Sequence, residues 1–121
     1  MKFHLFLSVF LMLILSSCSQ RAQKPKPFLS EKKMVELLTD IQLTEAALQR
    51  LQFSEYSLDR IKMHTNAAYS ELFEKYGINK ESFEANLYYR TYHSRDLERI
   101  FNKVNDNLQR LDSLNRLSEQ H

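Results

Sequence analysis

The scarcity of turn-forming residues constrains this chain more than any other feature of its sequence. Among 121 residues there is one glycine, Gly77, and there are two prolines, Pro25 and Pro27. Each hairpin of a β-sheet needs its own turn chemistry, so the sequence argues against a many-stranded sheet. Leucine, glutamate, lysine, arginine, glutamine and alanine are abundant instead, and all of them favour helices. The sequence therefore predicts an all-α fold.

The first 17 residues are typical of a secretory signal peptide. Lys2 supplies a positive charge, and the apolar run 3–15 is too short to span a bilayer as a stable helix. The segment Leu-Ser-Ser-Cys at 15–18 closely resembles the lipobox of bacterial lipoproteins. This resemblance implies that residues 1–17 are removed and that Cys18 carries covalent lipid on its sulfur and on its new amine.

Cys18 is the only cysteine of the chain, so an intrachain disulfide is excluded. The alternative is a secreted protein with a free thiol. Free thiols are poorly tolerated in an oxidising compartment, so we favour the lipoprotein. Apart from this covalent lipid, we expect no cofactor.

Two further parts follow the signal peptide. Residues 18–28 are predicted to be the lipidated cysteine and a flexible, basic tether, because Lys-Pro repeats favour extended backbone. Residues 29–121 are predicted to form one helical domain. Loss of the signal peptide removes one basic residue, Lys2, and leaves nearly balanced charge. Balanced charge and export both argue against a nucleic-acid partner.

Four stretches of the domain carry apolar residues at helical spacing. The first is predicted to begin at the N-cap Ser30 and to end near Phe53. The second should begin at Ser54 or Ser57 and end at Gly77, which suits a left-handed C-terminal cap.

The third stretch is predicted to begin at the N-cap Asn79 and to run to about Thr91. Ser94 should cap the fourth, whose apolar pattern thins after Leu111 and whose last residues, 118–121, should fray. Short connections favour antiparallel neighbours, so we expect a small bundle of about four helices.

The order and spacing of several segments resemble the Bacteroidetes-type family of small lipoproteins that contain a helical domain of unknown function. The segments are Met34–Ala46, Tyr76–Asn79 with Phe83, Asn86–Tyr89, and Leu97 with Ile100 and Val104. The resemblance implies an exported, lipid-anchored helical domain. It supplies no reaction, ligand or catalytic residue.

Two charged residues share helix faces with apolar residues. Glu45 lies on the side of Leu38 and Ile41, and Arg90 lies on the side of Phe83. A carboxylate and a guanidinium in such positions need partners. They are candidates for a ligand-binding or catalytic pair, but we favour a buried ion pair that fixes how the first and third helices meet.

Other residues give weaker signals for chemistry. Asp40 projects away from Glu45, so the two cannot act as a carboxylate dyad, and we expect Asp40 to lie on the surface or to tether a loop. His64 and His93 are far apart in sequence, so we expect no metal site. The chain also lacks a glycine-rich phosphate loop and a Gly-x-Ser-x-Gly elbow.

One dense aromatic and basic cluster is a candidate binding patch. It comprises Tyr88, Tyr89, Tyr92, His93 and Arg95. Tyrosine and arginine are enriched in protein interfaces. Tyr88 and Tyr92 should lie roughly opposite the apolar side of their helix, so they form either a binding surface or a second buried side covered by another helix.

These features favour a non-enzymatic accessory lipoprotein that docks to another envelope protein. The alternative is a small binding module for a glycan or lipid of the envelope, which would use the tyrosines; an enzyme that uses Glu45 is the least favoured. Ser19 is not the aspartate that resembles an inner-membrane retention signal, and residues 20–23 lack an acidic run that resembles a surface-export signal. We therefore expect an outer-membrane lipoprotein that faces the periplasm.

Overall fold

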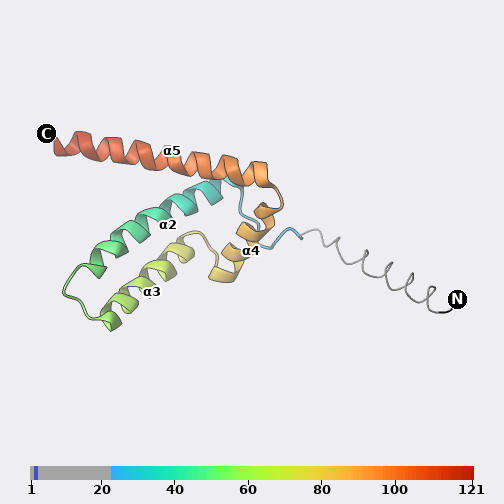
Figure 1. Ribbon diagram of the computed structural model, residues 1–121, viewed down its shortest axis with the longest axis horizontal. Coiled ribbons are helices and arrows are strands. Elements are labelled where there is room, and N and C mark those ends of the chain that lie inside the picture. The colour runs from blue at the N-terminus through green and yellow to red at the C-terminus, as the bar shows by residue number, and fades with distance from the viewer. Residues whose placement is uncertain (1, 3–22) are drawn as a thin grey trace.

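The computed structural model describes Lys2 and residues 23–121, so Cys18 and the predicted lipobox lie outside the described residues. Every regular element within residues 23–121 is a helix, which confirms the all-α fold (Figure 1). The helices are α2 (Glu31–Gln52), α3 (Leu58–Lys75), α4 (Lys80–Thr91) and α5 (Ser94–Glu119).

Local capping sets most of the helix boundaries. Ser30, Ser57 and Asn79 are N-caps whose side chains accept hydrogen bonds from backbone N–H groups three residues later. Gly77 follows the C-cap of α3 with φ of +64°, a conformation that glycine adopts without a Cβ penalty. The predicted ends of α2, α3 and α4 are therefore confirmed, with Ser57 rather than Ser54 as the cap of α3.

The two ends of α5 differ from the prediction. Its N-cap is His93, which makes no side-chain capping hydrogen bond, whereas Ser94 is already the first helical residue. The tight connection from α4 explains the shift, because the His93 N–H donates to the Arg90 carbonyl at 3.0 Å. At the other end, the helix continues to Glu119, past the point where the sequence predicts fraying.

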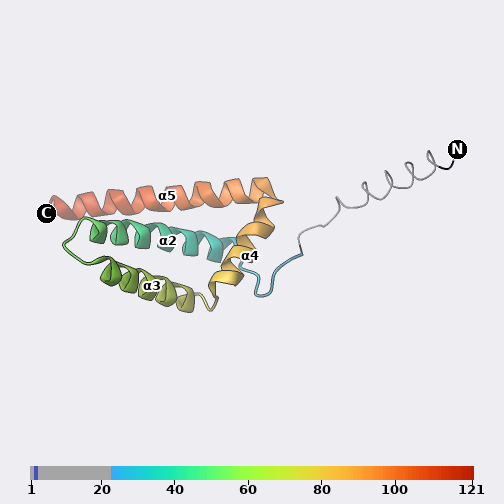
Figure 2. The ribbon, with the colours of Figure 1, turned by 60° about the horizontal axis from the view of Figure 1, so that its bottom comes forward.

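Helix α2 lies between two neighbours, as Figures 1 and 2 show. Helix α3 runs antiparallel to it, as the short connection predicts. Helix α5 runs parallel to it, because α4 crosses one end of the molecule and returns the chain to the start of α2. Ion pairs from Arg99 and Lys103 to Glu31 fix this parallel register.

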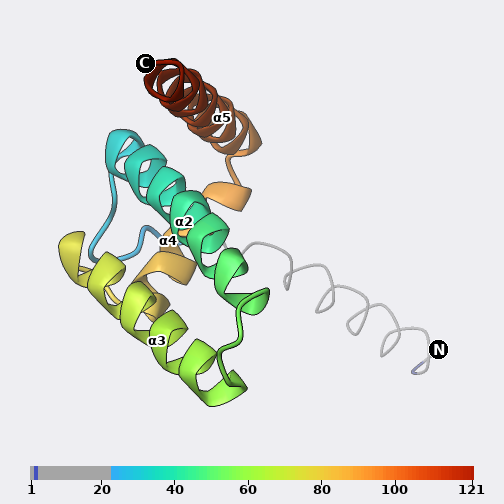
Figure 3. The same cartoon turned by 90° about the vertical axis from the view of Figure 1, so that its left-hand side faces the viewer.

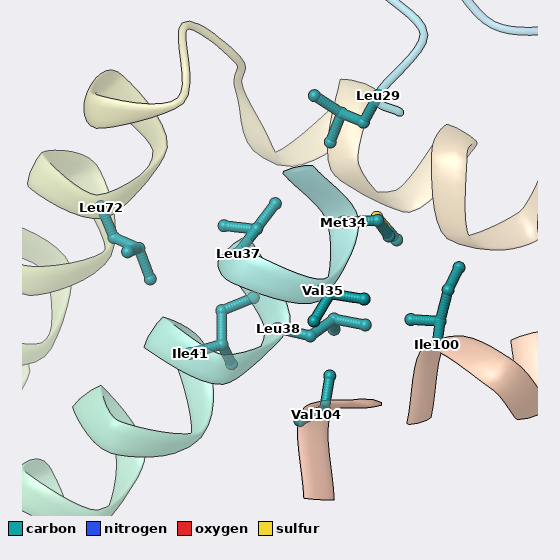
Figure 4. Close-up of a cluster of buried hydrophobic side chains, with 9 residues drawn as sticks. All are labelled: Leu29, Met34, Val35, Leu37, Leu38, Ile41, Leu72, Ile100 and Val104. Carbon is teal, nitrogen blue, oxygen red and sulfur yellow. The ribbon is translucent and has the colours of Figure 1, made fainter. Parts of the chain in front are cut away.

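The buried core lies close to α4 rather than along the whole bundle. Figure 4 shows its nine apolar side chains: Leu29, Met34, Val35, Leu37, Leu38, Ile41, Leu72, Ile100 and Val104. No residue of α2 beyond Ile41, and none of α5 beyond Val104, is fully buried within the described part of the chain. We call the two ends of the molecule the α4 end and the distal end, where the α2–α3 loop and the C-terminus lie.

None of the helices in the described residues is both long enough and apolar enough to cross a membrane.

Candidate functional site

The side chain of Asn86 on α4 clamps the chain segment that precedes α2. Its Oδ1 accepts a hydrogen bond from the Leu29 N–H at 2.8 Å, and its Nδ2 donates to the Pro27 carbonyl at 2.9 Å. Nδ2 also donates to the Ser82 carbonyl one turn earlier at 2.8 Å. Asn86 is completely buried, so these bonds satisfy an amide that would otherwise be costly to bury.

Arg90 lies one turn beyond Asn86 and extends this clamp. Its Nη2 donates to the Leu29 carbonyl at 2.7 Å, and its guanidinium lies 5.0 Å from the centre of the Phe28 ring. The residue is buried, and its Nε has no hydrogen-bond partner among the described residues. Asn86 and Arg90 together engage both backbone polar groups of Leu29.

The predicted ion pair between Glu45 and Arg90 is wrong. Glu45 is exposed and accepts a hydrogen bond from the Tyr69 hydroxyl at 2.8 Å, which joins α2 to α3. Partial burial and this carboxylate raise the pKa of Tyr69 to about 12. The spacing of apolar residues predicts the right face of α2, but the buried part of that face ends at Ile41, so the carboxylate stays near solvent.

The packed part of the chain begins earlier than predicted. Phe28, assigned from the sequence to the tether, packs edge-on against Tyr89 with 5.5 Å between ring centres. Pro27 is bonded to Asn86, and the Lys24 ammonium lies 4.2 Å from the centre of the Phe28 ring. The end of the predicted tether is therefore part of the folded domain.

The predicted tyrosine patch divides into two groups. Tyr88 and Tyr92 are 60% and 55% exposed, their rings meet edge-on at 5.3 Å, and their hydroxyls are 2.7 Å apart. The hydrogen bond between the two hydroxyls raises the pKa of Tyr92. Tyr89 instead lies between Phe28 and His93, whose ring centre is 5.1 Å away.

No helix of the described chain covers Tyr88 and Tyr92, which favours the surface interpretation of these tyrosines. Arg95 is also exposed. Phe28 was assigned to the tether from the sequence, although an aromatic residue directly before the apolar Leu29 is a signal that could have placed it against the domain.

Asp40 joins α2 to the end of α3, which agrees with the predicted tethering role. Its carboxylate accepts hydrogen bonds from Lys75 and from the Tyr76 hydroxyl, both at 2.7 Å. Partial burial raises the pKa of Asp40, but these two hydrogen bonds outweigh burial and hold the pKa below its usual value. The carboxylate lines an open cleft of about 450 Å³ that also includes Lys33 and Arg110.

The groups available for metal binding are sparse in the part of the chain that the structure describes. Residues 23–121 contain no group of three or more histidine, cysteine, aspartate or glutamate side chains close enough to hold an ion. His64 lies on α3 near the ring of Tyr56, far along the chain from His93 on the connection between α4 and α5.

The distal end exposes large apolar side chains that the sequence places on packed faces. Leu58, at the start of α3, is 76% exposed, and Leu111, up to which the apolar pattern of the fourth predicted helix is dense, is 37% exposed. The same end exposes Phe53, Tyr56, Met63, Leu114 and Leu117. This surface could not be predicted from the sequence, because helical spacing shows which residues share a face, but not whether another helix covers it.

Comparison with known proteins identifies the family. A model of the domain of unknown function DUF4296 matches residues 25–113, and the chain therefore belongs to this family. The match begins just before Pro27 and ends within α5, so it includes the clamped segment and the whole core. No curated protein and no solved structure matches the chain.

Proposed function

We propose that this member of the DUF4296 family is a non-enzymatic lipoprotein that docks to another protein of the cell envelope. Lipid on Cys18 would hold it in the outer membrane, facing the periplasm. The signal peptide and lipobox pattern of residues 1–18 support the anchor. The exposed apolar surface of the distal end supports the docking role.

The observation that carries the docking proposal is the set of exposed leucines towards the C-terminal end of α5. Leu111, Leu114 and Leu117 are 37%, 57% and 57% exposed, and an apolar surface of this kind in a small domain is typical of an interaction site. Charges on the C-terminal half of α5 are balanced, and Asp112 pairs with Arg116 at 2.9 Å. A helix that lies on anionic lipid is usually rich in lysine and arginine, so this half suits a protein partner better than a membrane.

Photo-crosslinking in intact cells tests the docking surface. A photoreactive residue at Leu114 should give a discrete adduct with one envelope protein. The matched control is the exposed Gln109, which lies about 140° away around the same helix. Equal adducts from both positions, or adducts from neither, would contradict the proposal.

Replacement of the lipobox cysteine tests the anchor independently. Cys18→Ala should abolish incorporation of labelled palmitate, because both lipid attachment and cleavage need that residue. Cys18→Ala protein that still carries label at the wild-type level would disprove lipidation at Cys18.

A second candidate function is binding of a glycan or lipid ligand, which the exposed Tyr88–Tyr92 pair favours. Tyrosine rings can stack on sugars and present a polar hydroxyl at an apolar surface. The double variant Tyr88→Ala, Tyr92→Ala should keep its thermal unfolding curve while losing ligand binding. A fall of tens of degrees in the melting temperature would instead assign both rings to the fold.

A further inference from the structure

The α4 end carries a group of aromatic and basic side chains that the docking proposal does not use. We call it the α4 aromatic face; it comprises the exposed Tyr88–Tyr92 pair and the neighbouring group of Phe28, Tyr89 and His93, and its basic residues are Lys24, Lys26 and Arg95. We infer that this face rests on the headgroup layer of the lipid bilayer beside the anchor. The inference deepens the proposed function and rests on its lipid anchor.

The chemistry of the exposed rings suits the boundary between lipid and water. Tyr88 and Tyr92 each expose more than half of their surface, and each combines an apolar ring with a polar hydroxyl. Aromatic residues with one apolar and one polar end are enriched where membranes meet water. The two hydroxyls bond to each other at 2.7 Å, so the pair presents its rings as one unit.

The basic side chains on the same face suit anionic headgroups. Lys24 and Lys26 lie in the chain segment that packs on α4, and the Lys24 ammonium lies over the Phe28 ring. Arg95 is the second residue of α5 and follows His93 by two positions. Basic residues close to a lipid anchor are attracted to an anionic membrane surface.

The acidic residues of α4 restrict this contact to the last turn of the helix. Glu84 lies one turn before Tyr88 on the same side of the helix, and Glu81 lies about one turn earlier still. Glu84 also pairs with Lys80 at 3.7 Å. The basic part of the face is therefore the part that lies closest to the last turn of α4.

The position of the face relative to the anchor is the third argument. Nine residues lie between Cys18 and Phe28, and the chain from one to the other spans at most about 35 Å at full extension. The chain enters the domain at the α4 end, whereas the distal end lies at the far end of α5, about 39 Å away for a 26-residue helix (Figure 2). Contact through the α4 aromatic face would point the distal end away from the bilayer, where a partner protein can reach it.

Tryptophan fluorescence provides a direct test, because the chain contains no tryptophan. Lipidated protein with Tyr92→Trp is reconstituted into vesicles of phosphatidylethanolamine and phosphatidylglycerol whose acyl chains carry bromine near the headgroups. The matched control is Phe53→Trp in the α2–α3 loop, an 87% exposed aromatic at the distal end. Both sites are exposed, so neither change should disturb the fold, and circular dichroism verifies this.

We expect the Tyr92→Trp reporter to be quenched several-fold more strongly than the Phe53→Trp reporter. Exchange of phosphatidylglycerol for phosphatidylcholine, or added salt, should reduce the difference, because screening weakens attraction between charged groups at a surface. Lys24→Gln with Lys26→Gln should reduce it in the same way.

Equal quenching of the two reporters would overturn the inference. Shielding of the Tyr92→Trp reporter in whole envelopes but not in pure lipid vesicles would also overturn it, in favour of a protein partner at this face. Flotation of the vesicles tests the lipid anchor independently of the contact between the α4 aromatic face and the bilayer. Protein that fails to float lacks the anchor, whereas protein that floats with equally quenched reporters lacks only the predicted contact.

Discussion

The α4 end and the distal end are built from the same long helices but differ in how far their apolar faces are covered. On one stripe of α5, Val104 is 5% exposed near α4, whereas Leu111, two turns later, is 37% exposed. On α2, Ile41 is buried but Leu48 is only half-buried. Figure 3 views the molecule from the distal end and shows α3 and α5 on different sides of α2. An apolar stripe is therefore buried only where a crossing element such as α4 completes the layer around it.

The two ends also differ in how polar groups are used. At the α4 end, Asn86 and Arg90 are buried and bond to backbone groups of the segment that precedes α2. Farther from α4, Glu45 is exposed and accepts a hydrogen bond from the Tyr69 hydroxyl. Buried polar groups with several partners fix a structure more strongly than exposed ones, because their unpaired state is costly.

The same substitution at the two ends should give the largest contrast. Leu37→Ala removes a fully buried side chain and should lower the free energy of unfolding by about 2–5 kcal/mol. Leu114→Ala should change it by no more than about 0.5 kcal/mol, because the side chain is already exposed. Urea unfolding monitored by circular dichroism measures both, and similar losses would show that the distal end is packed.

The Asn86 clamp should give the second largest effect. Asn86→Ala leaves the Leu29 N–H and the Pro27 carbonyl without their partner and should cost about 3 kcal/mol. The exposed Asn102 on α5 offers the matched control, and Asn102→Ala should be nearly neutral. Hydrogen exchange should also speed up at the Leu29 amide; an unchanged rate there would contradict the clamp.

The hydrogen bond between Glu45 and Tyr69 should contribute less to stability than the Asn86 clamp. Glu45→Gln and Tyr69→Phe should show a coupling energy of at most about 1 kcal/mol in a double-mutant cycle, since their hydrogen bond lies near solvent. Glu45→Gln and Arg90→Met should simply add, because the two residues have different partners. Strong coupling between Glu45 and Arg90 would show that the ion pair predicted from the sequence forms after all.

The smallest expected effect is a pH dependence at the start of α2. Hydrogen bonds from Arg99 and Lys103 lower the pKa of Glu31 from its usual 4.5 to about 2. A lowered folded-state pKa stabilises the fold above the unfolded-state value, and this stabilisation is lost as the pH falls from about 4.5 towards 2. Partly exposed ion pairs contribute little, so the melting temperature should fall modestly over this range.

The Glu31→Gln variant tests the origin of that pH dependence. It should melt slightly lower than wild type at neutral pH, and the difference should shrink as the pH approaches 2. A difference that stays constant with pH would mean that the carboxylate has no special role in joining α2 to α5.

The sequence was sufficient for features that depend on neighbouring residues. Ser30, Asn79 and Gly77 mark helix ends because capping and positive φ are properties of a few adjacent residues. The sequence also placed Tyr88 and Tyr92 on the side of α4 opposite Phe83, but it left open whether another helix covers them, and the structure shows them exposed. The N-cap of α5 was missed by one residue, because the tight turn after α4 replaces a side-chain cap.

Tertiary structure alone decided which faces are covered and which polar residues meet. Helical spacing placed Glu45 and Arg90 on apolar faces, but α2 is buried only up to Ile41, so Glu45 lies near solvent while Arg90 meets Leu29. The crossing of α4 also makes α5 parallel to α2 and leaves Leu114 without a neighbouring layer. Periodicity fixes directions around one helix axis, whereas burial depends on where the other helices lie, and that depends on contacts between residues far apart in the chain.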